Sequence, residues 1–425
     1  MRAGERAAPE SGSPRHSRQR PLSHQERVDL ALLALPTFAL ALAITTVSTQ
    51  LGEVTRRYTH DPIVIGSIIG AEGLMALWVP LIFGSWSDVL RTRIGGRLPL
   101  ILAGGIPAAG AVALIGLLNG IGLVAVASTM FFLFYFVAYV PYRAMYPDMT
   151  PDEISGRAQS TQGVSRGLGT GLALLGGGLL LSIGRPVPFA FAALVLLAAL
   201  GAFMRLLLRR GIPDQDRGEA QGPREVAHSV AELVRSDARL RAYFAANSLW
   251  ELTLAALKAF VVLYTVVGLG YALSTASLLI GGVAMVILLG AGVAGKLGDR
   301  FGRPRVVRVA LFGYGAGFTA LAFTTNRVVI GACIPFIALG GGTVMTMAYA
   351  LLTPLMPNAQ HGALTGFYSL SRGVGIVLGP VLAGVLIKLT RHNLFSGTDG
   401  FQAIWIVCAA ASFLSIPCMQ VLARR

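Results

Sequence analysis

Charged residues are scarce in this sequence. They make up 13% of its 425 residues, against roughly 25% in an average soluble domain, while hydrophobic residues make up 54%. So few polar groups cannot cover a soluble fold, and the apolar surface must face lipid. Lysine is rarer still, at Lys258, Lys296 and Lys388, and the arginines stand in short clusters between apolar runs. The net charge of +15 therefore indicates membrane topology, and we expect no nucleic-acid partner.

Cysteine and the motifs of enzymes are also scarce. The three cysteines, Cys333, Cys408 and Cys418, fall within apolar runs and have neither metal-ligand spacing nor the even number of a disulfide framework. The phosphate-binding pattern Gly-x-x-x-x-Gly-Lys-Ser/Thr is missing, and the six histidines lie mainly in the N-terminal tail or in loops. We therefore expect no enzyme, no metal site and no ATP-driven transport.

Long apolar runs are abundant. Each of twelve runs is close to the roughly 20 residues that a helix needs to cross a bilayer. The predicted spans are Leu30–Val47, Ile63–Phe83, Leu98–Leu118, Ile121–Val140, Gln162–Ile183, Val187–Leu208, Tyr243–Gly268, Leu273–Ala294, Val306–Phe323, Val328–Leu352, Ala363–Leu389 and Phe401–Leu422. The predicted fold class is thus an all-α integral membrane protein with twelve transmembrane helices.

The longest polar interruption divides these spans into two sets of six. We predict a disordered cytoplasmic tail over 1–27, a six-helix bundle over 28–208, a cytoplasmic linker over 209–242 and a second bundle over 243–425. In the linker, apolar residues recur at helical spacing, which predicts an amphipathic helix on the inner leaflet or else a flexible tether. Basic residues concentrate in the loops on the side of the N-terminus. The positive-inside rule therefore places both termini in the cytoplasm, in a multi-pass protein of the cytoplasmic membrane.

The two halves repeat short motifs. The pattern Gly-x-x-x-Asp at Gly84–Asp88 recurs at Gly295–Asp299, each time after the second span of a half and before a basic run. Ser-Arg-Gly-x-Gly occurs at Ser165–Gly169 and again at Ser371–Gly375. Internal repetition at this scale is typical of secondary transporters.

With these repeats, residues 28 to 425 resemble the major facilitator superfamily. The segments Gly84–Pro99, Pro141–Pro151 and Gly156–Ala158 are more specifically similar to the glycoside–cation symporters and sucrose transporters. The resemblance implies the major facilitator fold, two pseudo-symmetric six-helix bundles that work by alternating access.

The repeated Gly-x-x-x-Asp motif is predicted to act as a cytoplasmic gate. A carboxylate at Asp88, just beyond a helix end, can accept hydrogen bonds from free N–H groups of a neighbouring helix and pair with nearby arginines. The resemblance implies a latch that forms in the outward-open state and breaks in the inward-open state. The alternative is that these arginines only set the topology. The predicted gating motif comprises Gly84, Asp88, Arg91, Arg93, Arg97, Gly295, Asp299, Arg300 and Arg303.

Ionisable residues within the spans are the main functional signal, since one at a helix centre costs about 2.5 to 3.5 kcal/mol on insertion scales. Glu72, near the middle of the second span, resembles the acidic cation site of the glycoside symporters. The resemblance implies a cation site with more than one acid, but the fourth span of this sequence has none. We therefore favour a proton over sodium at Glu72. A structural, hydrogen-bonded carboxylate is the alternative.

Glu251 and Lys258 are seven residues apart in the seventh span. Both therefore project from one helix face, about 10.5 Å apart along the axis. We predict that they share a cavity wall and form a coupling site with Glu72, which is a candidate partner for Lys258. In the alternative, the two side chains snorkel toward opposite ends of the helix.

A substrate cavity is predicted from polar and aromatic side chains within the spans. Arg166 and Arg372 occupy equivalent positions in the two halves, and either snorkel to the inner surface or pair with cavity carboxylates. Tyr135 and Tyr139 are four residues apart, which puts both hydroxyls on one helix face for stacking on a substrate or for packing. The residues predicted to line the cavity are Tyr135, Tyr139, Asn247, Trp250, Arg166 and Arg372.

These features together predict a proton-coupled secondary transporter of a small organic solute, with no cofactor and the proton gradient as energy source. Symport of a sugar or glycoside is favoured. The alternatives are proton-driven efflux of amphipathic drug-like compounds and a non-transporting pigment-delivery or assembly factor on the same fold. The expected partners are the lipid bilayer, a small-molecule substrate and the proton, and we expect a monomer.

Overall fold

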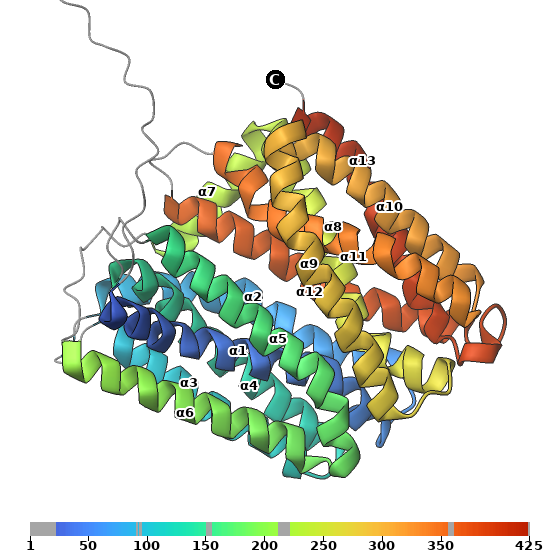
Figure 1. Ribbon diagram of the computed structural model, residues 1–425, viewed down its shortest axis with the longest axis horizontal. Helices are drawn as coiled ribbons and strands as arrows, with labels where there is room; N and C mark the ends of the chain where they lie inside the picture. Colours follow the sequence, from blue (N-terminus) through green and yellow to red (C-terminus); the bar gives the residue numbers. More distant parts are fainter. Residues whose placement is uncertain are drawn as a thin grey trace, which may run out of the picture.

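The computed structural model describes residues 23–90, 92, 96–149, 155–210, 222–355 and 361–423. This part of the chain is helical almost throughout (Figure 1), because a helix satisfies its own backbone hydrogen bonds in lipid. Its α-helices are α1 His24–Arg56, α2 Pro62–Val89, α3 Arg97–Leu117, α4 Ile121–Asp148, α5 Ser155–Ile183, α6 Pro186–Arg210, α7 Pro223–Ser236, α8 Ala238–Leu263, α9 Leu273–Phe301, α10 Arg303–Phe323, α11 Arg327–Leu352, α12 His361–Thr390 and α13 Ile404–Ala423.

Twelve helices in the described residues are long and apolar enough to cross a membrane, which confirms the prediction of twelve spans. Helix α7, with 14 residues, is not one of them. It lies in the predicted linker and contacts α2, α8 and α12, so an ordered helix forms where the apolar spacing favours one. A short π-helical segment, Tyr264–Gly268, continues α8, and short 3-10 turns at Ser396–Thr398 and Phe401–Ala403 precede α13.

The two sets of six helices pack in the same way. In the first half, α1 contacts α5 and α6, α3 contacts α4 and α6, and α2 contacts α4. In the second half, α8 contacts α12 and α13, α10 contacts α11 and α13, and α9 contacts α11. Each contact of one half therefore has its counterpart in the other, which confirms two pseudo-symmetric six-helix bundles.

Helix α1 starts and ends beyond the predicted span. Its first turn is fixed by a capping box, in which Ser23 and Glu26 exchange hydrogen bonds between side chain and backbone. Past Val47 the sequence is polar, yet the helix continues to Arg56, and the buried hydroxyls of Ser48 and Thr49 find carbonyl oxygens one turn earlier as partners.

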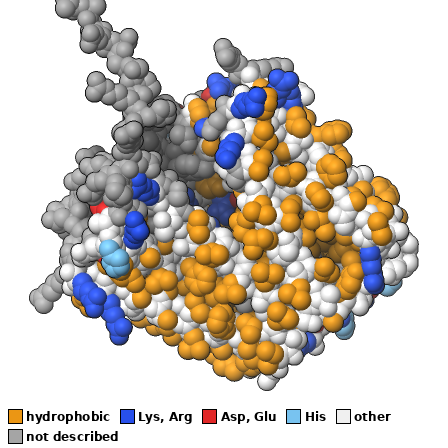
Figure 2. Space-filling model, viewed as in Figure 1, with side chains coloured by type: hydrophobic (Ala, Val, Ile, Leu, Met, Phe, Trp, Pro, Cys, Tyr) orange, Lys and Arg blue, Asp and Glu red, His pale blue; other side chains and the backbone are white. Residues whose placement is uncertain are grey.

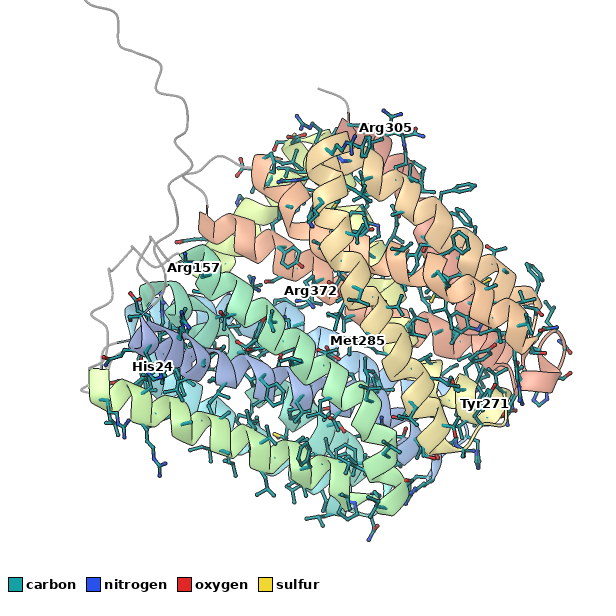
Figure 3. The ribbon with its side chains drawn as sticks, in the orientation of Figure 1. His24, Arg157, Tyr271, Met285, Arg305 and Arg372 are labelled. Atoms are coloured by element: carbon teal, nitrogen blue, oxygen red, sulfur yellow. The ribbon has the colours of Figure 1, made fainter. Side chains whose placement is uncertain are left out.

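The membrane faces of the molecule are marked by labelled residues in Figure 3. His24, Arg157 and Arg305 lie at the end of the bundles that also carries α7, which we name the linker face. Tyr271 lies at the other end, which we name the opposite face. The halves meet through α2 with α12, α5 with α9 and α1 with α8. In Figure 1 they diverge toward the linker face, and Figure 2 shows the surface hollowed between them, with Lys or Arg side chains inside.

Glycines permit the close contact between α2 and α12. A side chain at Gly66 would clash with the carbonyl group of Pro380, and one at Gly73 would clash with the backbone of Val377. Closer to the opposite face, the N–H of Gly178 in α5 donates to the hydroxyl of Ser277 in α9 at 2.8 Å. The halves are therefore bonded to each other on the opposite-face side of the hollow.

Candidate functional site

A small cavity lies where the two halves meet, with room for about one water molecule. Helices α1 and α2 of the first half and α8 and α12 of the second half form its walls. The residues that line it are Ser48, Ile69, Glu72, Glu251, Ala255, Lys258, Ile376 and Pro380. Glu72, Glu251 and Lys258, the predicted coupling residues, thus line one cavity, and Glu251 and Lys258 stand on the same wall of it.

Glu72 is deeply buried, with 6% of its surface exposed. Its Oε2 lies 2.6 Å from the hydroxyl of Ser48, and that hydroxyl also lies 2.8 Å from the carbonyl oxygen of Ile44. A serine hydroxyl has one proton to donate. With a proton on Glu72, both contacts become hydrogen bonds, because Glu72 donates to Ser48 and Ser48 donates to Ile44. With an ionised Glu72, Ser48 can satisfy only one of the two acceptors at a time.

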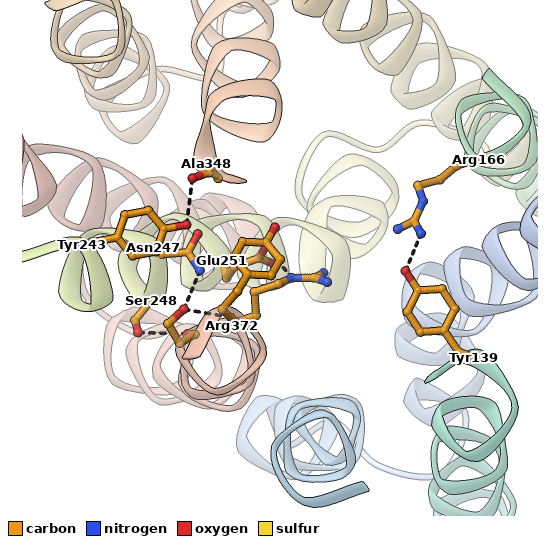
Figure 4. Close-up of polar contacts among 10 residues, drawn as sticks. Tyr139, Arg166, Tyr243, Asn247, Ser248, Glu251, Ala348 and Arg372 are labelled. Carbon is orange, nitrogen blue, oxygen red and sulfur yellow. Dashed lines mark hydrogen bonds and ion pairs between the residues drawn. The ribbon is translucent and has the colours of Figure 1, made fainter. Parts of the chain in front are cut away.

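Glu251 is held by Arg372. The Nε of Arg372 in α12 donates to Oε1 of Glu251 in α8 at 2.7 Å (Figure 4), and the guanidinium also lies over the ring of Tyr368. This arrangement is the predicted pairing of Arg372 with a cavity carboxylate. In the described part of the chain no ion pair joins Lys258 to Glu72, since the carboxylate of Glu72 faces Ser48 instead. Glu72 and Lys258 therefore line the same cavity, but they do not form the direct contact that we expected between them.

Among the described residues, Arg166 pairs with a phenol and not with a carboxylate, contrary to one predicted alternative. Its Nη2 donates to the hydroxyl of Tyr139 in α4 (Figure 4), and its guanidinium lies 5.4 Å from the centre of that ring. The reason is that α4 carries no acid before Asp148 and offers phenol groups at this level. Tyr135 and Tyr139 stack with ring centres 5.5 Å apart, as their four-residue spacing predicts.

Asn247 and Trp250 lie inside the second half. Asn247 donates from Nδ2 to the hydroxyl of Ser371 in α12 at 2.7 Å, and Trp250 donates from its ring nitrogen to Ser415 in α13 at 3.1 Å. Both are buried, Trp250 with 2% of its surface exposed. In this conformation both side chains point toward neighbouring helices of their own bundle, and a part for them in lining a substrate cavity stays a prediction.

The predicted gating motif falls largely outside the described residues. The structure describes neither Arg91 nor Arg93, nor the side chains of Asp88 and Asp299, nor the contacts of Gly295. Of the others, Gly84 lies in α2 and Arg97 begins α3. Arg303 begins α10 and donates to the carbonyl oxygen of Ala350 at 3.0 Å, and Arg300 lies over the ring of Phe301. The described arginines of the second copy thus contact their own half, and the latch remains a prediction.

Sequence reasoning missed Ser48 and an ion pair at the opposite face. The signal for Ser48 was the polar run at the end of the first span, which lies against the other half. The ion pair joins Lys388 of α12 to Asp61, which caps α2, at 2.6 Å. Asp61 and Lys388 are far apart in the sequence, and each lies next to the end of a span. Their pairing could not be predicted from the sequence, because it depends on how α2 packs on α12.

Twelve spans, paired bundles and ionisable groups at the interface of the bundles define the class of the protein. A family model described as Major Facilitator Superfamily matches residues 31–288 and 256–425. The chain belongs to the Major Facilitator Superfamily.

Individual relatives are more distant. Multidrug resistance protein 3 of Bacillus subtilis (strain 168) is 29% identical over 114 residues, which are 26% of this chain and only 22% of that protein. Among solved structures, a variant of the nucleoside transporter NupG has a TM-score of 0.75 at 14% identity, over 94% of this chain and 100% of that chain. The D-xylose-proton symporter has a TM-score of 0.70 at 14% identity, over 92% of this chain and 97% of that chain. At these identities the structural likeness shows the fold alone.

Proposed function

We propose that this protein is a proton-coupled secondary transporter of a small organic solute, working by alternating access. The position of the ionisable cavity supports the proposal. It lies between the halves rather than inside one of them, so the charge of Glu72 acts directly on the surface along which the bundles move relative to each other. A group whose protonation changes this interface biases the equilibrium between conformations, which is the linkage that a coupled transporter needs.

Glu72 is the proton-binding residue in this proposal. Burying an ionised carboxylate is costly unless it is paired, and the contact of Glu72 with Ser48 is fully satisfied only when Glu72 carries a proton. Lys258 lies in the same cavity, and its positive charge attracts Glu72 when Glu72 is deprotonated. Glu251, already paired with Arg372, is the second carboxylate that can exchange partners.

Sugar or glycoside import remains the favoured substrate assignment within this proposal. The resemblance to glycoside–cation symporters and the fold shared with the D-xylose-proton symporter support it. Efflux is the second candidate, because a partial relative is named as a multidrug resistance protein. The linker face is cytoplasmic in both proposals, as the distribution of basic residues predicts.

The test uses the purified full chain in proteoliposomes that contain a pH-sensitive dye. Each member of a panel of sugars, glycosides and lipophilic cations is added under an imposed proton gradient, and proton movement is followed. We expect a substrate to move protons through the wild-type protein, in the same direction as an imported sugar and in the direction opposite to an exported cation. In Glu72→Gln we expect this movement to fall about tenfold or more, while exchange of labelled substrate at equal concentrations persists.

Glu53→Gln is the matched control. It makes the same chemical change in a carboxylate that pairs with Arg56 within α1, so proton movement should stay near the wild-type level. Proton movement at the wild-type level in Glu72→Gln would remove Glu72 from the mechanism. Solute movement that ignores the gradient in the wild-type protein would overturn proton coupling itself.

A further inference from the structure

Two arginines face each other across the hollow between the halves. Arg166 projects from α5 of the first half and Arg372 from α12 of the second, and Figure 4 shows both guanidinium groups directed into the same space. Both side chains are half-buried. They are also the equivalent residues of the internal repeat, so each half supplies one cation at the same depth.

Both guanidinium groups keep unused hydrogen-bond donors. A guanidinium has five N–H donors. In the described part of the chain, Arg372 uses Nε for Glu251 and Arg166 uses Nη2 for Tyr139. Both guanidinium groups are directed toward the hollow (Figure 4), and a planar carboxylate or a phosphate matches the fork geometry of their N–H donors.

The balance of charge around the hollow is positive. Arg166, Arg372 and Lys258 are three cations, and Glu72 and Glu251 are the two carboxylates that face them from α2 and α8. When Glu72 is protonated, Glu251 is the one negative charge left within this group. Two guanidinium groups directed into the same space repel each other. An anion between them would relieve that repulsion and offset the excess positive charge.

We propose that the transported solute is a small organic anion whose carboxylate or phosphate binds between Arg166 and Arg372. This inference rests on the proposed transport function and narrows its substrate class. Combined with the favoured sugar assignment, it points to an acidic sugar rather than a neutral one.

Binding of the anion and binding of the proton are linked in this arrangement. Arg372 holds Glu251 through Nε alone, so an anion on Arg372 competes with Glu251 for the same positive charge. A released Glu251 is an unpaired, half-buried carboxylate, and a proton passed on from Glu72 in the same cavity neutralises it. The anion and the proton therefore bind together and are carried in the same direction, as symport requires.

The first experiment measures binding with matched pairs of compounds that differ in one acidic group. D-glucuronate is compared with D-glucose, D-galacturonate with D-galactose, and D-glucose 6-phosphate with D-glucose, by thermal shift and calorimetry on the full chain in detergent at pH 7. We expect the acidic member of at least one pair to bind about thirtyfold or more tightly than its neutral partner. The uronates and the sugar phosphate separate a carboxylate from a phosphate ligand. Equal binding of acidic and neutral members, or preference for the neutral ones, would overturn the proposal.

The second experiment tests the two arginines. Arg166→Gln and Arg372→Gln should each weaken binding of the acidic compound about thirtyfold, and Arg372→Lys should retain part of it because the charge remains while the fork is lost. Arg327→Gln, at a surface arginine that lies over Tyr271 at the opposite face, is the matched control and should bind like the wild type. Since Arg372→Gln leaves Glu251 unpaired, the double variant Arg372→Gln with Glu251→Gln provides a folded alternative. Wild-type affinity in Arg166→Gln and in the double variant would refute the anion site between the two arginines.

The proteoliposome measurement separates this inference from the proposed function. Proton-driven uptake of a neutral sugar, without binding of acidic ones, would refute the anion site and leave the proposed function standing. Arginine-dependent binding of an acidic sugar, without any response to the proton gradient, would refute the coupling and leave the anion site standing.

Discussion

At the scale of single residues, Asp61 has two roles. Its Oδ1 accepts from the N–H of Ile63 at 3.0 Å and caps α2, and its Oδ2 accepts from Lys388 of the other half at 2.6 Å. Both side chains are partly exposed, and an exposed ion pair is worth at most about 1 kcal/mol. Conformations of a transporter differ by only a few kcal/mol, so even this small term affects their populations.

We expect Asp61→Asn to favour opening of the opposite face. Asparagine is as good a helix cap as aspartate, so the substitution keeps the start of α2 and removes the charge that holds Lys388. Spin labels at the ends of α2 and α12 on the opposite face should show the separated population rising by about two- to fivefold. Glu53→Gln, which breaks an ion pair within α1, should leave the distances unchanged. An equal response in both variants would assign the effect to general loss of surface charge.

The pH dependence of this contact has a defined sign. The hydrogen bond from Lys388 lowers the pKa of Asp61 below its ordinary value of 3.8. The stabilising effect of the pair is therefore fully present above that ordinary value and is lost only as the pH falls through the lower value of the folded state. The difference between Asp61→Asn and wild type should consequently be the same at pH 5.5 and 7.5. A proton gradient in that range acts on groups other than Asp61.

At the scale of elements, the contact of α2 with α12 depends on glycines placed at particular helical turns. A methyl group at Gly66 would meet the backbone carbonyl of Pro380, which cannot move aside without moving α12. One at Gly70 would lie 3.4 Å from the carbonyl oxygen of Val377 and 3.6 Å from a methyl of Val381, which is ordinary contact. The two positions are one turn apart on the same helix.

Gly66→Ala should therefore disturb the interface of the halves and Gly70→Ala should not. We expect Gly66→Ala to cost about 1 to 3 kcal/mol in this conformation, because α2 and α12 must separate, while Gly70→Ala costs little. Thermal melting of the purified protein and spin-label distances across the opposite face measure the two effects together. Similar melting and distances in the two alanine variants would show that helix propensity, and not the contact, controls this interface.

The elements were largely predictable from sequence and their contacts were not. Spans follow from hydrophobicity, which is a property of each segment alone. The predicted spans are therefore too short where a helix continues into polar residues, as α9 does into a basic turn and α1 into a polar run. The grouping of Glu251 with Lys258 was also predictable, since helix periodicity fixes which side chains share a face. The partner of Arg166 was not, because it depends on how α5 is rotated against α4. The same reason places Trp250 toward α13, inside its bundle.

At the scale of the whole molecule, the internal repeat has a mechanical meaning. Each half is held together by the same set of helix contacts, while the halves meet through three helix pairs that are related by the same symmetry. A structure of this kind has two bodies and one interface, and rocking about that interface exposes the central site to one face at a time. The structure is closed at the opposite face and hollowed toward the linker face. The anion site between Arg166 and Arg372 is thus reached from the linker face in this conformation.

The orientation of that hollow in the membrane decides which compartment the site faces, and cysteine labelling tests it. In a variant that lacks the three native cysteines, Ser182→Cys and Thr325→Cys probe the opposite face, and Ser236→Cys and Lys296→Cys probe the linker face. All four side chains are exposed. Because basic loops stay in the cytoplasm, we expect a membrane-impermeant maleimide to label the first pair on intact cells and the second pair only after permeabilisation. Labelling of Ser236→Cys on intact cells would reverse the orientation. Labelling of Ser182→Cys and Thr325→Cys from different sides would contradict twelve spans, since both must lie on one face if each half crosses the membrane six times.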